Sequence, residues 1–196
     1  MLKKQPFFIP EFSNEVHHEV ELLVRINKIG KHIPIIGSFS QRCDRKREDV
    51  LEDLFYYLPQ ATEYKIYPQW LPAYAWYFGG SVKLDLFNSQ EDIEYINNKN
   101  IDITLDLCHL SLSAEYSKES WLDWYNQLKD RIGHFHLADA EGVDGEGLDI
   151  GSGNIGDFSI FLDSEKIKVI EVWQGHFHDG IGFLKALDTL NKQKQK

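Results

Sequence analysis

Three short apolar segments of this chain end in side chains that can bind a metal ion or transfer a proton. Asp106 and His109 end the first, His134 and His136 lie in the second, and Glu171 ends the third. Carboxylate and imidazole together are typical ligands of zinc, manganese or cobalt, whereas magnesium prefers oxygen. A single aspartate here is more often a helix cap, and a single histidine more often a structural residue. The same pattern at three successive segments favours one shared site.

Parallel strands are the elements expected to position these side chains. Each apolar segment has the length of a strand and is followed by a helix-like segment, which is the repeat of a parallel α/β sheet. Such sheets and barrels carry their functional residues at the carboxyl ends of the strands. The expected strands are 62–67, 101–106, 132–137 and 167–173, and the expected helices are 44–58, 89–98, 117–131, 157–164 and 180–191.

Four strand–helix units make about half of a (β/α)8 barrel, which has eight units and typically about 250 residues. The expected fold class is therefore α/β, a partial (β/α)8 (TIM) barrel of about four βα units in a chain of 196 residues. Residues 16–26 alternate between apolar and polar, which predicts an extra N-terminal strand. The expected domains are 1–33, with this strand, and 34–196, with the partial barrel.

The composition of the chain indicates its cellular compartment and excludes some classes of binding partner. A formal net charge of -10 argues against nucleic acid and anionic membranes, since both require a basic surface. Two cysteines indicate a reducing compartment rather than a disulfide framework. The start, Met1 to Pro6, lacks the apolar segment of a signal peptide, and no apolar run reaches the length of a membrane span. We expect a cytoplasmic protein.

Four short motifs occur in a fixed order along the chain. They are Asp106-Leu-Cys-His109, His136-Leu-Ala-Asp139, the glycine-rich loop with Gly151 and Gly153, and the strand end at Glu171. Together they resemble the C-terminal half of the xylose-isomerase-like TIM-barrel superfamily, which contains sugar phosphate isomerases and epimerases. The resemblance covers residues 34–190 and implies a small-molecule sugar or sugar phosphate as substrate.

The resemblance also implies one divalent metal, with Mn, Mg, Co and Zn as the candidates. Asp106, His136 and Glu171 would be its ligands. Glu171 would also act as general base, and His109 would contact a substrate oxygen.

Further residues are expected to support this site. Asp139 and His134 would contact the metal ligands rather than the metal and would orient them, for example by fixing a histidine tautomer. Gly151 and Gly153 lie in a loop that could cover the substrate or could be an ordinary connection. Trp76 could stack on a sugar, although aromatic side chains in loops are as often packing residues.

One position departs from the family pattern. The fifth strand of such enzymes ends in a glutamate ligand, but the segment from Tyr64 to Pro68 ends without one, and Glu63 lies at its opposite end. In the family's chemistry a metal polarises a carbonyl while two carboxylates move a proton. The missing carboxylate counts against full isomerase activity and favours binding alone.

The N-terminal segment has a resemblance of its own. Glu19 and Glu21 are two residues apart, so on a strand they face the same way. Residues 4–33 resemble a piece of the fumarylacetoacetate hydrolase family, in which such a pair binds magnesium or manganese. The alternative is the polar face of an edge strand. Two partial resemblances in one chain suggest a fused or truncated reading frame.

The sequence leaves three candidate functions for this protein. The first is a metal-dependent sugar isomerase or epimerase-like enzyme, impaired by the missing glutamate. The second is a fragment of a metal-dependent acylpyruvate hydrolase that uses Glu19 and Glu21. The third is a non-catalytic half-barrel that forms a homo-oligomer and thereby covers its open sheet edges.

Overall fold

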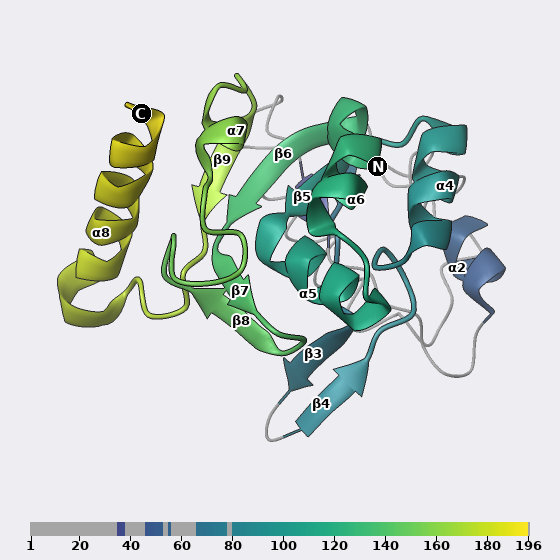
Figure 1. The fold of residues 1–196 in the computed structure, drawn as a ribbon. Coiled ribbons are helices and arrows are strands. Elements are labelled where there is room, and N and C mark those ends of the chain that lie inside the picture. The colour runs from purple at the N-terminus through teal and green to yellow at the C-terminus, as the bar shows by residue number, and fades with distance from the viewer. Residues whose placement is uncertain (1–34, 38–45, 53–54, 56–65, 78–79, 196) are drawn as a thin grey trace, which may run out of the picture. The chain divides into compact units, whose positions relative to one another are not determined.

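The computed structural model describes residues 35–37, 46–52, 55, 66–77 and 80–195 (Figure 1). The chain divides into two compact units, and the larger one contains the described residues from Tyr67 onward. Helix α2 (Arg47–Glu52) belongs to the smaller unit. The strand expected at 16–26 lies outside the described residues.

A parallel sheet forms the centre of the larger unit. It consists of β5 (Ile103–Asp106), β6 (Ile132–Leu137) and β9 (Ile167–Ile170), in that order. Strand β2 (Ile66–Pro68) pairs with β1 (Ile35–Gly37), and the residue after β2 forms a parallel bridge to Thr104 in β5. This bridge places the segment after β2 parallel to β5, so the segments lie side by side in the order in which they follow along the chain. The α/β fold with βα units is confirmed, and within the described residues the sheet does not close into a barrel.

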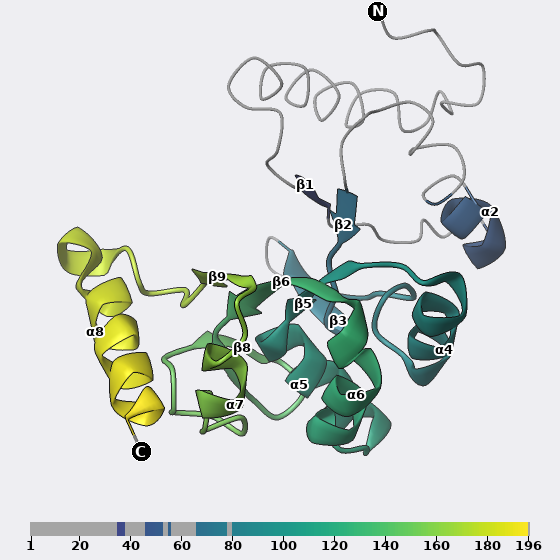
Figure 2. The ribbon, with the colours of Figure 1, turned by 90° about the horizontal axis from the view of Figure 1, so that it is seen from above.

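The larger unit also contains helices. Their bounds are α4 (Gln90–Lys99), α5 (Leu107–Ser117), α6 (Trp121–Leu128), the 3-10 turn η3 (Lys129–Arg131), α7 (Ser159–Leu162) and α8 (Phe177–Lys194). Figure 2 shows α5, α6 and α7 on the same side of β5 and β6. Within the described part of the chain, no helix has both the length and the apolar character required to cross a bilayer.

The start of α4 is a capping box formed by Ser89 and Asp92. The Ser89 side chain accepts a hydrogen bond from the Asp92 backbone N–H, and the Asp92 carboxylate accepts from the Ser89 backbone N–H in return. This exchange satisfies N–H groups that have no partner inside the helix. The helix therefore starts where the expected helix 89–98 does.

The helix expected at 117–131 is wrong in its bounds. Instead, α5 begins directly after Asp106, and α6 follows after a break at Lys118, which has a φ of 59°. Helix α5 is buried along most of its length, from Leu107 to Ala114. A helix buried on several sides lacks the polar face that reveals a helix in a sequence.

Two segments expected to be loops contain hairpins. Strands β3 (Tyr74–Tyr77) and β4 (Gly80–Lys83) pair antiparallel, as do β7 (Asp139–Glu141) and β8 (Gly145–Leu148). The second hairpin directly follows β6, so it lies at the carboxyl end of the sheet, where a site is expected.

An aromatic core supports the sheet from its helical side. Phe161 of α7 packs against Phe135 of β6, with ring centroids 5.9 Å apart. Trp70 meets Trp124 of α6 edge to face at 5.8 Å. All four side chains are almost fully buried. This close packing holds the strand ends in defined positions.

Candidate metal centre

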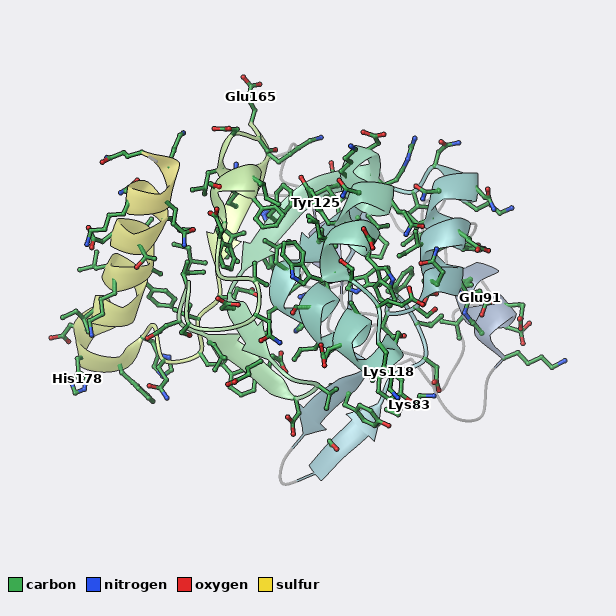
Figure 3. The ribbon with its side chains drawn as sticks, viewed as in Figure 1. Lys83, Glu91, Lys118, Tyr125, Glu165 and His178 are labelled. Atoms are coloured by element: carbon green, nitrogen blue, oxygen red, sulfur yellow. The ribbon has the colours of Figure 1, made fainter. Side chains whose placement is uncertain are left out.

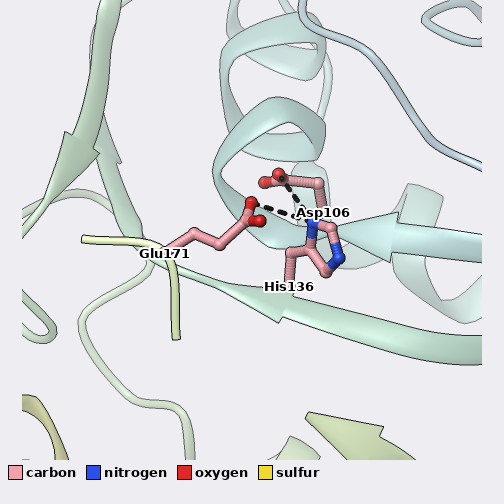
Figure 4. Close-up of side chains that lie close together, drawn as sticks. All are labelled: Asp106, His136 and Glu171. Atoms are coloured by element: carbon pink, nitrogen blue, oxygen red, sulfur yellow. Dashed lines mark ion pairs between the residues drawn. The ribbon is translucent and has the colours of Figure 1, made fainter. Parts of the chain in front are cut away.

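Asp106, His136 and Glu171 meet at the carboxyl end of the sheet (Figure 4). One ligand atom from each lies within 4.8 Å of the others. Asp106 and His136 are register partners in β5 and β6. Glu171 directly follows β9, and its backbone N–H donates to the Leu137 carbonyl at 2.9 Å. The parallel register thus brings together the three residues predicted to bind a metal.

The histidine of this cluster lies between the two carboxylates. Its Nδ1 is 2.8 Å from Glu171 Oε2 and 3.8 Å from Asp106 Oδ2. Burial lowers the pKa of His136, but its contacts with Asp106 and Glu171 outweigh burial and raise the pKa to about 9. The cluster therefore stabilises a positive charge, carried here by an imidazolium ion.

The two acids differ in exposure. The side chain of Asp106 is 4% exposed and that of Glu171 is 43% exposed. Burial raises the pKa of Asp106, but the neighbouring His109 and His136 outweigh it, so the net shift is downward. Asp106 also caps α5, since its Oδ1 accepts from the His109 backbone N–H at 3.1 Å. The same residue is therefore both a helix cap and a member of the cluster.

Gln69 is the residue that the sequence analysis missed. It follows β2, the strand on which the family glutamate was expected, and it is 8% exposed. Its Nε2 lies 3.1 Å from Asp106 Oδ2 and 3.3 Å from His136 Nδ1. The expected strand ends at residue 67, and the family has a carboxylate at this position, so a glutamine after Pro68 carries no sequence signal.

His109 is held beside the cluster through both ring nitrogens. Nδ1 lies 3.0 Å from the Trp70 carbonyl and 3.3 Å from Asp106 Oδ2, and Nε2 lies 2.8 Å from Glu146 Oε1. Burial lowers the pKa of His109, but Asp106 and Glu146 outweigh it and raise the pKa to about 9. Its predicted contact with substrate stays a prediction. The sequence analysis did not single out Glu146, which lies in β8.

His134 lies next to His136, as expected for residues two apart on a strand. The two rings meet edge to face with centroids 5.1 Å apart. His134 is buried, and within the described residues its Nδ1 has no hydrogen-bond partner. Burial and the adjacent His136 lower its pKa, so His134 is neutral at pH 7. Its predicted support of the metal ligands stays a prediction.

Asp139, which was expected to orient a ligand, is the first residue of β7. It is fully buried, and its carboxylate accepts hydrogen bonds from five backbone N–H groups at 2.9 to 3.3 Å. The donors are Ala140, Gly151, Gly153, Ile155 and Gly156. Within the described residues these partners are backbone groups rather than an imidazole. Asp139 therefore holds the glycine-rich loop, and its predicted effect on a histidine stays a prediction.

The remaining predicted site residues are outside this cluster. Gly151 and Gly153 direct their N–H groups to Asp139, so their contact with substrate stays a prediction. Trp76 lies in β3, but its side chain is outside the described part of the structure. Glu19 and Glu21 also lie outside the described residues.

The chain belongs to the Xylose isomerase-like TIM barrel family, whose model matches residues 12–190. A comparison with curated proteins returned no match. Among solved structures, the chain is similar to 3-keto-D-glucoside 4-epimerase, YcjR, from E. coli, in its apo form. The TM-score is 0.56 at 17% identity, over 81% of this chain and 63% of the other. The chain thus spans less than two thirds of that structure's length.

The family match begins at residue 12 and so includes the predicted N-terminal strand. The comparisons do not support the resemblance of residues 4–33 to the fumarylacetoacetate hydrolase family. The division of the chain at residue 33 stays a prediction.

Proposed function

We propose that this protein is a divalent-metal-dependent isomerase or epimerase-like protein that acts on a sugar or a sugar phosphate. The convergence of Asp106, His136 and Glu171 is the observation that carries the proposal. Two carboxylates and one imidazole form a donor set that suits manganese, cobalt or zinc better than magnesium. The burial of Asp106 and His136 also fits a metal centre, because buried charges require a partner.

The metal, when bound, would polarise a carbonyl or hydroxyl oxygen of the sugar. Asp106 and His136 would hold it from the buried side of the cluster. Glu171 is the most exposed of the three, and so it is the carboxylate that we assign to proton transfer at a sugar carbon. The similar E. coli protein is a 3-keto-D-glucoside 4-epimerase, whose substrate has a carbonyl beside the reacting carbon. That chemistry supports the same reaction type for this chain.

Gln69 at the expected glutamate position removes one carboxylate from the cluster. Proton transfer by two carboxylates then lacks one partner, so we expect slower turnover than in a site with both. This is the physical basis for proposing an impaired enzyme.

The test combines metal analysis with proton exchange. Purified protein is analysed for bound metals, and then incubated in D₂O with a panel of ketoses, sugar phosphates and 3-keto-glucosides. Wild type should incorporate deuterium next to the substrate carbonyl, as detected by NMR. The Asp106→Asn and His136→Gln variants should bind no metal and should incorporate no deuterium into the substrate. Circular dichroism should show that both variants are folded. Wild-type protein with neither metal nor exchange would contradict the proposal.

The homo-oligomeric half-barrel remains a second candidate because of one exposed surface. Large apolar side chains of β9, of α8 and of the segment between them are exposed, namely Ile167, Val169, Trp173, Phe177, Ile181, Leu184 and Leu187. The exposed fraction reaches 64% at Leu184. Patches of this kind mark interfaces. We propose a second copy of the chain as the partner. Light scattering should give a dimer mass that Leu184→Lys converts to a monomer, whereas a wild-type monomer would exclude this candidate.

The hydrolase alternative rests only on Glu19 and Glu21. The double variant Glu19→Ala/Glu21→Ala, included in the same metal analysis, tests it directly. Loss of metal from this variant but not from Asp106→Asn would favour the hydrolase assignment.

A further inference from the structure

Gln69 is positioned at the candidate metal centre by the backbone. A parallel bridge joins Gln69 to Thr104 of β5, and Thr104 lies two residues before Asp106 in that strand. Its side-chain amide lies against both buried ligand residues, at 3.1 Å from Asp106 and 3.3 Å from His136. At 8% exposure the amide is largely shielded from water. The fourth parallel strand therefore contributes a polar group to the same point as the other three.

The chemistry of an amide allows two states at this position. With its nitrogen toward the cluster, Gln69 donates to Asp106 Oδ2, whereas its 3.3 Å approach to His136 Nδ1 is a hydrogen bond only when that nitrogen carries no proton. A half-turn about the bond to the amide carbon exchanges nitrogen for oxygen. Side-chain amide oxygens are ordinary ligands of divalent cations. The same side chain can thus bond Asp106 without a metal and coordinate the metal when it binds.

We propose that Gln69 is the fourth, neutral ligand of this centre, and that its neutrality suits the loaded site to a substrate that binds the metal through an anionic oxygen. This inference rests on the proposed function. Asp106 and Glu171 contribute two negative charges, which balance a divalent cation. A glutamate at position 69 would leave the loaded site with one negative charge in excess. The neutral amide leaves the metal more electrophilic and removes a repulsion from an anionic ligand.

The first experiment measures Mn²⁺ affinity by calorimetry on the full chain. Gln69→Leu should weaken Mn²⁺ binding at least about tenfold, as expected for loss of a group that supports a metal. Gln69→Glu should bind Mn²⁺ at least as tightly as wild type. Gln90→Leu is the matched control, because it removes another amide, one that bonds Gln127 on the protein surface, and it should leave affinity unchanged.

The second experiment uses oxalate, a planar dianion with adjacent oxygens, as the probe. Oxalate should bind Mn²⁺-loaded wild type about tenfold more tightly than Mn²⁺-loaded Gln69→Glu, because the added carboxylate repels it. The electron paramagnetic resonance spectrum of Mn²⁺ should change on oxalate addition in wild type. Circular dichroism establishes that each variant is folded.

The outcomes separate the two proposals. Wild-type protein that fails to bind Mn²⁺, Co²⁺ or Zn²⁺ would overturn both the metal centre and the role of Gln69. Wild-type binding that Gln69→Leu does not weaken would overturn only the role of Gln69. Equal oxalate affinity in wild type and Gln69→Glu would overturn the inference about substrate charge.

Discussion

Glu146 Oε1 lies 2.8 Å from His109 Nε2, although the two residues are 37 positions apart in the chain. This contact joins the β7–β8 hairpin to the first turn of α5. The same imidazole lies 3.3 Å from Asp106, so the hairpin is connected through one ring to the candidate metal centre. Gly147 strengthens the connection, since its backbone N–H donates to Cys108 Sγ and its carbonyl accepts from the Trp173 N–H.

Removing the Glu146 charge should lower the pKa of His109. The folded pKa of about 9 exceeds the ordinary value of 6.5, so the interaction stabilises the fold fully below pH 6.5 and is lost as pH rises through 9. Glu146→Gln should therefore reduce the free energy of unfolding by about 1 to 2 kcal/mol at pH 6 and have little effect above pH 10. Urea unfolding across this range and NMR titration of the imidazole measure both effects.

Glu165→Gln is the matched control for this variant. Glu165 is exposed and its side chain points away from the rest of the structure (Figure 3). Its substitution should change neither the His109 titration nor stability. A Glu146→Gln protein that behaves like this control would contradict the assigned ion pair.

Asp139 should be among the most sensitive positions for stability. Asp139→Ala leaves five backbone N–H groups without their buried acceptor and should destabilise the fold by at least about 3 kcal/mol. Asp149→Ala, an exposed aspartate in the same loop, should cost less than about 0.5 kcal/mol. Denaturant midpoints at pH 7 measure the difference, and similar midpoints would exclude the anchoring role.

Metal affinity should increase with pH. In the metal-free protein the pKa of His136 is about 9, so at pH 7 a bound metal must displace a proton from this ring. The pKa of Asp106 is lowered, so Asp106 does not contribute in this range. Mn²⁺ affinity should therefore rise about tenfold per pH unit from 7 to 8.5. Calorimetry in buffers of different ionisation enthalpy should count close to one proton released, and a pH-independent affinity would argue against His136 as a ligand.

The thiol of Cys108 should be unreactive in the folded protein. Cys108 is 2% exposed, and burial, followed by the charge of Asp106, raises its pKa. In a Cys43→Ser background, which leaves Cys108 as the single thiol, a disulfide reagent should label native protein at least about a hundredfold more slowly than denatured protein. Rapid native labelling would mean that α5 opens readily.

Local pattern was sufficient for much of the sheet and for three members of the candidate site. Strand β6 spans 132–137 as predicted, because an apolar run bounded by polar residues is a local signal. Asp106, His136 and Glu171 could be selected because a polar group at a strand end is visible without knowing its neighbours. Their convergence followed from the parallel register, which one general rule predicts.

Contacts between distant segments could not be predicted in this way. Helix α5 gave no amphipathic signal because it is buried on several sides. Gln69 and Glu146 carry no motif, and their proximity to Asp106 and His109 depends on how separate strands pack. Asp139 matched a motif, yet the fold surrounds it with backbone N–H groups.

The sequence by itself determined which residue types stand at the strand ends, because strand and helix propensities act over a few neighbouring positions. Only the tertiary structure decided which polar groups each of those residues meets. Hydrogen bonds and ion pairs depend on distances of about 3 Å, and in a folded chain such distances join residues far apart in sequence.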